Sequence, residues 1–191
     1  FDAVAIDRFD YLVKHRLTPC LALAKLNSEG LVTACEADLQ SLLLMLVSRE
    51  LTGYTGWIAN ATAFSGSRGL FSHCTIALNM VREGRVLAHF ESGYPHALSG
   101  KLAQEVYTIA SLSPDLEVLG VGVARVVESG LLSGAACRTQ ALVELGPWAE
   151  DLPRIAPANH HVFIPGDVVE ELRAVAKLLG LRVIRYPSAA E

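Results

Sequence analysis

Two adjacent histidines, His160 and His161, begin an apolar run in the segment A-P-A-N-H-H-V-F-I-P-G-D, residues 156–167. The run is typical of a β-strand, and a strand points successive side chains to opposite faces. Only one of the two imidazoles can therefore face a given site. The other must face a packed layer, a hydrogen-bond acceptor or solvent. The alternative is a satisfied structural pair at the start of a strand.

Two carboxylates, Glu36 and Asp38, follow a short strand-like run at the point where a helix begins. In open α/β sheets, ligands bind at this edge of the sheet. Glu36 is nearer to the end of the strand and could project into a site. Asp38 also has a structural explanation, because the helix dipole favours a carboxylate in the first turn.

Further polar residues that could bind a ligand or take part in catalysis lie between these two segments. His73 lies inside an apolar strand-like run, where a lone histidine is more often a core residue than a ligand. His89 and Glu91 would share one face of a strand, which suits either a ligand cluster or an exposed ion pair. Arg138 and Gln140 follow a loop rich in Gly and Ala. The Arg138 guanidinium could donate paired hydrogen bonds to a carboxylate, a phosphate or a sugar hydroxyl. The alternative is a structural salt bridge.

The elements that must position these residues change in character near residue 60. Before it, strand-like runs at 1–6, 31–34 and 57–59 alternate with helical patterns, the strongest of them at 36–51. This rhythm is typical of a parallel α/β unit. After it, short strand-like runs are separated by turns, which favours an antiparallel barrel or sandwich. These runs are 71–78, 85–90, 105–112, 119–128, 140–145 and 161–164.

We therefore predict a mixed fold, α/β plus β, in two domains. Residues 1–60 are expected to form a partial βαβ segment, the end of a central α/β domain. Residues 61–191 are expected to form an antiparallel β-barrel domain that ends with a helix at 166–179 and a strand at 181–186. The glycine at position 180 favours a helix end there.

The composition excludes several classes of protein. Of 191 residues, 51% are hydrophobic and 19% are charged, which argues against disorder. The net charge is −4 and the basic residues are scattered, so we expect no nucleic-acid partner. The longest apolar run, 42–47, is far shorter than the ~20 residues of a membrane span. The 4 cysteines lie far apart without a C-x-x-C pair, which favours a reducing cytoplasm.

Several motifs, in this order, resemble the L-fucose isomerase family over nearly the whole chain. The segment 18–39, T-P-C-L-A-L-A-K-L-N-S-E-G-L-V-T-A-C-E-A-D-L, resembles the end of the central domain of that family. The runs W-I-A-N-A, S-H-C-T-I-A-L-N-M-V, H-F-E-S-G, C-R-T-Q and N-H-H-V-F-I-P-G-D resemble its β-barrel domain. The likeness is greatest to fucose-isomerase-related proteins of prokaryotes.

The resemblance implies a divalent metal, expected to be Mn²⁺, held by a glutamate, an aspartate and a histidine. By motif, the glutamate corresponds to Glu36, the aspartate to Asn60, and the histidine to His160 or His161. The related arabinose isomerases imply a further histidine ligand, at His73. The implied reaction is aldose–ketose isomerisation through an enediol, with Glu36 as base and ligand and Asn60 in the second catalytic position.

Asn60 departs from the family pattern, because an amide lacks the charge and the proton-transfer ability of a carboxylate. Metal affinity should fall, and Asn60 favours the alternative function unless another carboxylate, Glu91 or Asp38, substitutes. The alternative function is a sugar-binding relative that does not isomerise, or an inactive fragment of a longer isomerase. Arg138 would bind substrate together with a set of other polar residues, namely His89, Glu91, Gln140 and Asn159.

We also expect the chain to form a homo-oligomer. The sequence starts at Phe1 and reads directly as a strand, which suggests a fragment of a longer protein or a shortened relative. A lone strand–helix–strand piece buries too little surface to stand alone. An apolar face near residues 1–30 should therefore be covered by self-association.

Overall fold

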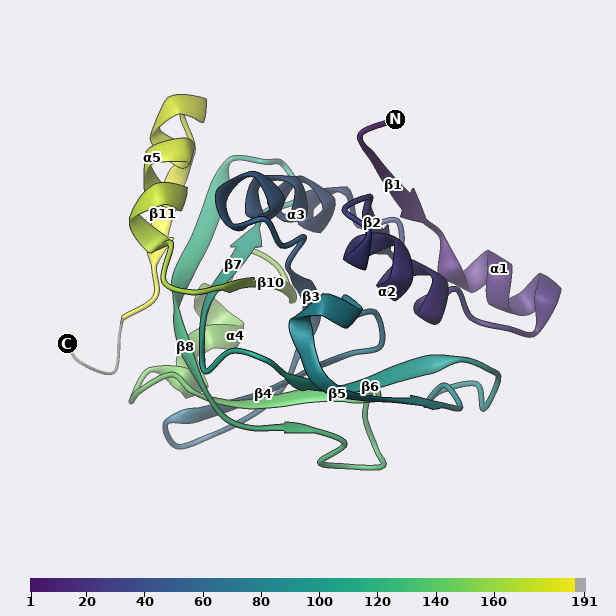
Figure 1. The fold of residues 1–191 in the computed structure, drawn as a ribbon. Helices are drawn as coiled ribbons and strands as arrows, with labels where there is room; N and C mark the ends of the chain where they lie inside the picture. The colour runs from purple at the N-terminus through teal and green to yellow at the C-terminus, as the bar shows by residue number, and fades with distance from the viewer. Residues whose placement is uncertain (188–191) are drawn as a thin grey trace.

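A closed antiparallel β-barrel of six strands forms the centre of the structure (Figure 1), a computed structural model that describes residues 1–187. Its strands pair in the order β8 (Val118–Gly130), β7 (Val106–Leu112), β10 (His160–Pro165), β3 (Trp57–Ser65), β4 (Arg68–His73) and β9 (Thr139–Glu144). β9 also pairs with β8, and this pairing closes the barrel. β11 (Arg182–Arg185) adds to β8 in parallel. The predicted β-barrel is confirmed.

Alternation along the strands creates a core on each side of the barrel wall. In β10, Phe163 packs inside with Trp57, Phe71 and Tyr107. Its neighbour Val162 belongs to a second apolar cluster, which includes residues of the helices α3 (Leu39–Thr52) and α5 (Val169–Leu179). Both faces of this strand are therefore buried, as its continuous apolar run indicates.

Helix α3 lies across the outside of the barrel, against β10 and β7 (Figure 1). Asp38 caps its first turn by accepting a hydrogen bond from Ser41 N, at 2.8 Å. Gly53 ends the helix in the left-handed conformation, with a φ of 77°, which glycine adopts without strain. The cap at Asp38 places the start of α3 beside the first residue of β10.

The N-terminal segment forms a small parallel sheet of β1 (Ala3–Ile6) and β2 (Val32–Cys35). Between them lie α1 (Arg8–His15) and α2 (Cys20–Ser28). The third expected strand of this unit, 57–59, is instead the start of β3 in the barrel, where it pairs antiparallel with β10. The expected boundary after residue 60 therefore lies within a strand, and the assignment of two domains stays a prediction.

Two expected strands end earlier than the sequence indicates. β4 ends at His73, where its pairing with β9 stops, and the chain then enters a short 3₁₀ helix, η1 (Leu78–Met80). β5 (Val81–Leu87) ends before His89, so His89 and Glu91 lie in a turn rather than on one strand face. β5 pairs with β6 (Ala97–Leu102), which the sequence did not predict, and β6 packs against β8 and β9.

The remaining elements are short. A 3₁₀ turn, η2 (Ala149–Asp151), leads into α4 (Leu152–Ile155). Within residues 1–187, every helix is too short or too polar to cross a lipid bilayer.

Candidate functional site

The site begins at a tight turn between β2 and α3. Glu36 and Ala37 both adopt the left-handed conformation there, with φ values of 63° and 53°. This conformation is uncommon for residues other than glycine, and such strain is concentrated at functional sites. Backbone hydrogen bonds hold the turn, from Ala37 N to Ile6 O and from Asp38 N to Cys35 O. The turn presents the Glu36 carboxylate to two histidines from the barrel.

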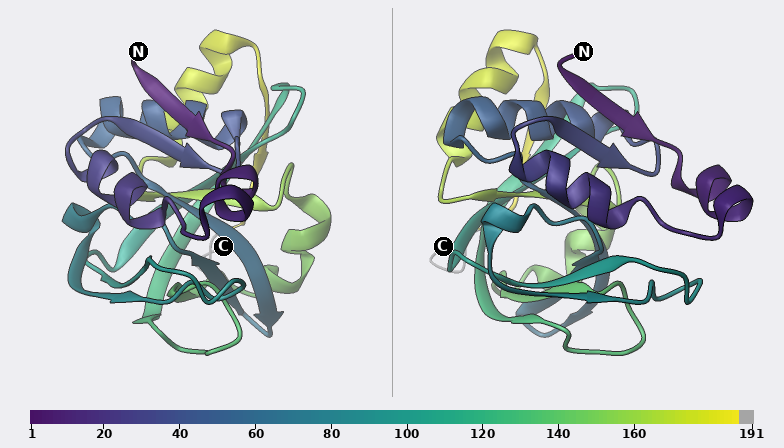
Figure 2. Two further views of the ribbon diagram at one scale, coloured as in Figure 1. Left: turned by 90° about the vertical axis from the view of Figure 1, so that its right-hand side faces the viewer. Right: turned by 45° about the vertical axis from the view of Figure 1, so that its right-hand side comes forward.

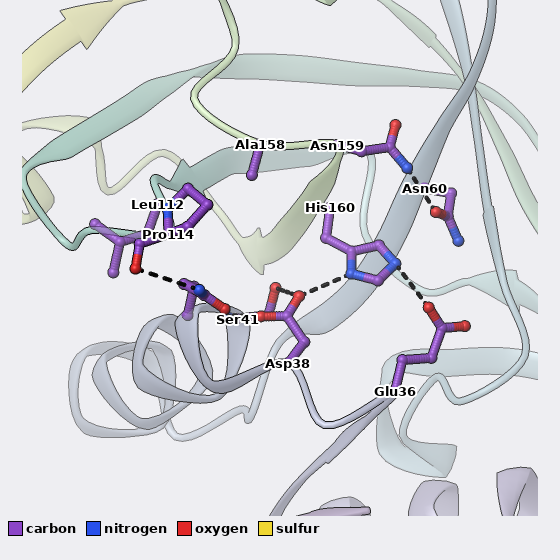
Figure 3. Close-up of a pocket in the computed structure, with 10 residues that line it drawn as sticks. Glu36, Asp38, Ser41, Asn60, Leu112, Pro114, Ala158, Asn159 and His160 are labelled. Carbon is purple, nitrogen blue, oxygen red and sulfur yellow. Dashed lines mark hydrogen bonds and ion pairs between the residues drawn. The ribbon is translucent and has the colours of Figure 1, made fainter. Parts of the chain in front are cut away.

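The two imidazoles approach the Glu36 carboxylate from different strands. His73, the last residue of β4, places Nε2 at 3.6 Å from Glu36 Oε1. His160, the first residue of β10, places Nε2 at 3.5 Å from Glu36 Oε2. Figure 3 shows the His160 ring between Glu36 and Asp38. Three residues distant in sequence thus direct potential ligand atoms toward one region.

The far side of each ring has a partner. His160 donates from Nδ1 to Asp38 Oδ2 at 2.7 Å, since a carboxylate can only accept. His73 Nδ1 contacts Thr75 Oγ1 at 3.0 Å. A carboxylate that holds the outer nitrogen of an imidazole is typical of metal-binding histidines, because it fixes the tautomer and the ring orientation.

The inner nitrogens have no such partner. Among the residues described, the Nε2 atoms of His73 and His160 are buried and have no hydrogen-bond partner. Burial lowers the pKa of His73, so its ring is neutral near pH 7. Buried polar atoms normally form hydrogen bonds. Two such nitrogens beside a carboxylate could hold a metal ion.

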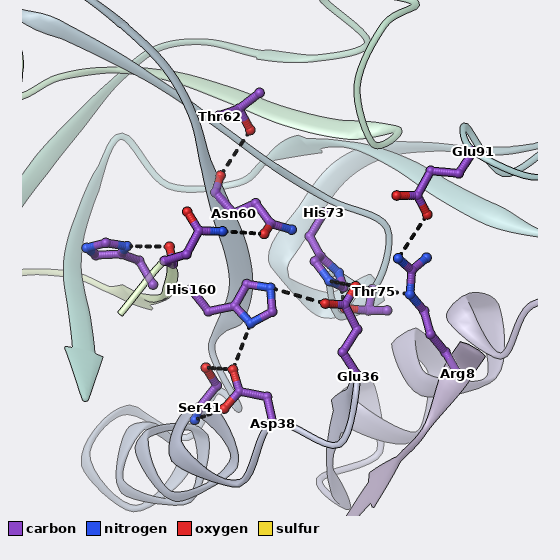
Figure 4. Close-up of polar contacts among 12 residues, drawn as sticks. Arg8, Glu36, Asp38, Ser41, Asn60, Thr62, His73, Thr75, Glu91 and His160 are labelled. Atoms are coloured by element: carbon purple, nitrogen blue, oxygen red, sulfur yellow. Dashed lines mark hydrogen bonds and ion pairs between the residues drawn. The ribbon is translucent and has the colours of Figure 1, made fainter. Parts of the chain in front are cut away.

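The site holds a buried cation that the sequence did not reveal. Arg8, in α1, places Nε at 3.0 Å from Glu36 Oε1. It also donates to Glu91 Oε2 at 2.9 Å (Figure 4). A further hydrogen bond joins Arg8 to His89 Nε2 at 2.8 Å. No local pattern could have indicated Arg8, because both hydrogen-bond partners lie more than 80 positions away.

These contacts set the charge state of the carboxylates. Burial of Glu36 opposes ionisation, but His73, Arg8 and His160 outweigh it and lower the pKa of Glu36 to about 2. Burial likewise opposes ionisation of Asp38, and its hydrogen bonds from His160 and Ser41 lower its pKa. Both carboxylates are therefore ionised at neutral pH.

Asn60 lies next to His160 in the barrel wall, because the two residues are paired in the register of β3 and β10. Its Oδ1 accepts a hydrogen bond from Asn159 Nδ2 at 2.7 Å. A cavity of about 250 Å³ opens here (Figure 3). It is lined by Glu36, Asp38, Gln40, Ser41, Asn60, Leu112, Pro114, Ala158, Asn159 and His160.

His161 faces the opposite side of the wall. It is fully buried in the barrel, where Nε2 contacts Tyr186 Oη at 3.2 Å and the ring packs on Phe71. Burial lowers its pKa to about 4. Of the two histidines left open by the sequence, the alternation of β10 therefore favours His160 as the candidate ligand, and His161 faces the barrel interior. His161 also contacts Asn159 O at 3.1 Å, which supports the loop before the site.

The expected substrate-binding residues have separate roles in the structure. Gln140 is fully buried and binds the loop before it, accepting from Leu132 N and Ser133 N and donating to Ser133 O and Cys137 O. Arg138 donates to Ala88 O at 2.8 Å and lies over the Phe90 ring. Of the predicted set, only Asn159 lines the cavity beside Glu36.

Asp38 and Glu91 do not provide a free second carboxylate. Both oxygens of Asp38 accept hydrogen bonds, Oδ1 from Ser41 N and Oδ2 from Ser41 Oγ and His160. Glu91 is bound to Arg8. The cavity thus contains an amide at position 60, where the family pattern has an acid, and the structure offers no replacement base at that position.

The thiol of Cys35 lies beside the site. Ligand atoms of Cys35, Glu36 and His73 all lie within 4.8 Å of one another. Burial raises the pKa of Cys35. This group could hold a metal ion, and no motif in the sequence indicates that Cys35 belongs to it.

No protein-family model and no curated protein matches this chain. Membership of the L-fucose isomerase family therefore stays a prediction that depends on the sequence motifs.

Proposed function

We propose that this protein is a metal-dependent isomerase that interconverts the aldose and ketose forms of a sugar or sugar derivative. Glu36, His73 and His160 would hold the divalent metal. The observation that carries the proposal is the pair of buried, unpartnered Nε2 atoms beside the Glu36 carboxylate. The cavity at this carboxylate is polar along Asp38, Asn60 and Asn159, as a sugar ligand requires.

The reaction moves a proton between C1 and C2 of the sugar. A bound divalent metal polarises the carbonyl and stabilises the negative charge that develops on the substrate oxygens. Glu36 is assigned the proton transfer, and its Oε2 atom faces the same region as His160. The Asn60 amide can orient a sugar hydroxyl. A carboxylate with a pKa of about 2 is a weak base, so we expect slow turnover.

The test combines metal binding with chemistry. We expect calorimetry to show Mn²⁺ or Zn²⁺ bound at one site, and a panel of aldoses and ketoses in D₂O to show metal-dependent deuterium incorporation at C2 of one substrate. The variants H73A and H160A should lose both signals, whereas H15A, on the surface of α1, should keep them. Absence of metal binding in the purified chain would contradict the proposal.

A sugar-binding protein without turnover is the second candidate, and Asn60 favours it. In that case a sugar binds, but deuterium is not incorporated. The variant N60D then distinguishes the two, because a restored acid should raise exchange only if the rest of the site is competent.

The 4 cysteines are free thiols, which supports a reducing compartment such as the cytoplasm.

A further inference from the structure

We propose that the Cys35 thiolate is a ligand of the metal at this site and that the centre consequently selects zinc over manganese. This inference rests on the metal site of the proposed function and specifies its donor set. It starts from the close approach of the ligand atoms of Cys35, Glu36 and His73, all within 4.8 Å of one another.

The backbone explains how two consecutive residues can serve one ion. Cys35 is the last residue of β2, and a regular strand would point Cys35 and Glu36 to opposite faces. Glu36 instead has a φ of 63°, and Ala37 a φ of 53°. This left-handed turn brings the carboxylate back to the side of the thiol. The strained turn thereby places the Cys35 thiol and the Glu36 carboxylate on the same side of the backbone, which an extended strand cannot do.

Charge is the second argument. Arg8 lies 3.0 Å from Glu36 Oε1 and 2.9 Å from Glu91 Oε2, so it compensates part of the negative charge of Glu36 before a cation arrives. Both oxygens of Asp38 are bound by Ser41 and His160. Burying a divalent cation beside Arg8 requires additional negative charge. A Cys35 thiolate, formed when its proton is released on metal binding, supplies that charge.

The donor chemistry then decides which metal binds. Thiolate and imidazole ligands favour zinc, whereas manganese favours carboxylate, carbonyl and water oxygens. Cys35 would add one sulfur donor to the Glu36 carboxylate and to the His73 and His160 imidazoles of the proposed metal site.

The direct test uses the unaltered chain. The protein is loaded with one equivalent of Zn²⁺, and X-ray absorption at the zinc edge should show one sulfur neighbour at about 2.3 Å. A shell of nitrogen and oxygen alone would overturn the assignment of Cys35, while the metal site of the proposed function would remain. Two or more sulfur neighbours would place zinc among Cys20, Cys74 and Cys137, which form a separate buried cluster, and would also overturn it. Failure to bind any metal would contradict both proposals.

Variants provide an independent readout. Titration of the apo-protein with Co²⁺ should produce a sulfur-to-cobalt charge-transfer band, which C35S abolishes and C137S retains. We expect C35S to weaken Zn²⁺ binding by more than about 100-fold, because changes to outer-shell partners alone cost 10–100-fold. Mn²⁺ binding should change much less, so the preference for zinc should shrink. Equal affinity of the unaltered protein for Zn²⁺ and Mn²⁺ would overturn the selectivity. If C35S fails to fold by circular dichroism, the absorption measurement still decides.

Discussion

Glu36 is the residue on which the site depends, and its ionisation links the site to the stability of the fold. Its carboxylate contacts Arg8, His73 and His160, which are supplied by one helix and two strands. The Glu36 carboxylate stabilises the packing of these three elements only while it is charged. The site and the packing of the N-terminal segment on the barrel are therefore coupled.

The pH dependence of unfolding should reveal this coupling in the metal-free protein. The folded-state pKa of Glu36 is about 2, below its ordinary value of 4.5. The stabilisation is thus fully present above the unfolded-state pKa and is lost as the pH falls toward 2. We expect E36Q to lower the free energy of unfolding by on the order of 3 kcal/mol near neutral pH. In urea titrations, the gap between E36Q and the unaltered protein should narrow below about pH 4. A constant gap would contradict the expectation.

Asp38 should affect metal binding without touching the metal. It caps α3 and accepts from His160 Nδ1. Since Asn caps helices as well as Asp, D38N keeps the cap but removes the charge that orients the imidazole. We expect metal affinity, measured by calorimetry, to fall 10–100-fold with little change in melting temperature. D10N, an exposed charge in α1, serves as the control, and equal affinities of D38N and D10N would refute the role.

At the scale of elements, the C-terminal strand depends on small residues in β8. Tyr186 follows β11 and lies over the barrel wall, where it also contacts His161. A Cβ atom at Gly122 would lie 2.6 Å from Tyr186 Cβ, and one at Gly120 would lie 2.1 Å from Tyr186 Oη. Gly120 and Gly122, in the apolar first half of β8, therefore mark a close approach of Tyr186 to this strand.

Substitution at this contact should be costly. We expect G122A to lower the free energy of unfolding by about 1–3 kcal/mol. The atoms that an added Cβ would meet include the Cβ and the backbone carbonyl of Tyr186, which cannot easily move. Thermal unfolding provides the measurement. G134A is the matched control, since nothing lies within 4 Å of a Cβ there, and it should be nearly neutral. Equal effects of the two changes would show that the contact is not tight.

At the scale of the whole molecule, the N-terminal helix α1 exposes large apolar side chains. Figure 2 shows α1 extending away from the barrel. Along it, Phe9 is 56% exposed and Val13 is 76% exposed. Residues four apart lie on one helix face, so these side chains form a contiguous apolar strip. Self-association through this strip remains the expectation for the chain.

Light scattering of the purified protein tests this expectation. We expect an assembly larger than a monomer, and V13E should shift it toward the monomer, because a charge in an apolar interface is costly. V86E adds the same charge at a half-exposed valine of β5 and should leave the assembly unchanged. A monomer at all concentrations of the unaltered chain would contradict the prediction.

Metal binding should also stabilise the molecule as a whole. A ligand at 100 times its dissociation constant adds about 2.7 kcal/mol to the free energy of unfolding. We expect Zn²⁺ to raise the melting temperature of the unaltered protein, and to have little effect on H160A. Addition of a chelator should reverse the shift, and equal shifts in both proteins would place the metal elsewhere.

The sequence by itself determined those features that depend on local periodicity. The apolar run His161–Ile164 predicts a strand, and because a strand points successive side chains to opposite faces, only one of His160 and His161 can serve the site. The glycine at position 180 similarly indicates where a helix ends. The helix expected at 36–51 begins at Leu39, with Asp38 as its cap. Such signals lie within a few residues and survive in any context.

Only the tertiary structure decided which side of the wall each histidine faces, and which residues surround Glu36. The contacts of Arg8 with His89 and of Asp38 with His160 span 81 and 122 positions, beyond any local pattern. His89 and Glu91 left their expected strand because β5 ends where its partner β6 begins to pair, at Leu87 and Ala97. Cys35 lies at the site because Glu36 and Ala37 form a left-handed turn. The sequence does not predict such a turn, because residues other than glycine seldom adopt this conformation. The side chains around Glu36 are therefore positioned by strand pairing and chain reversal, which depend on partners distant in the sequence.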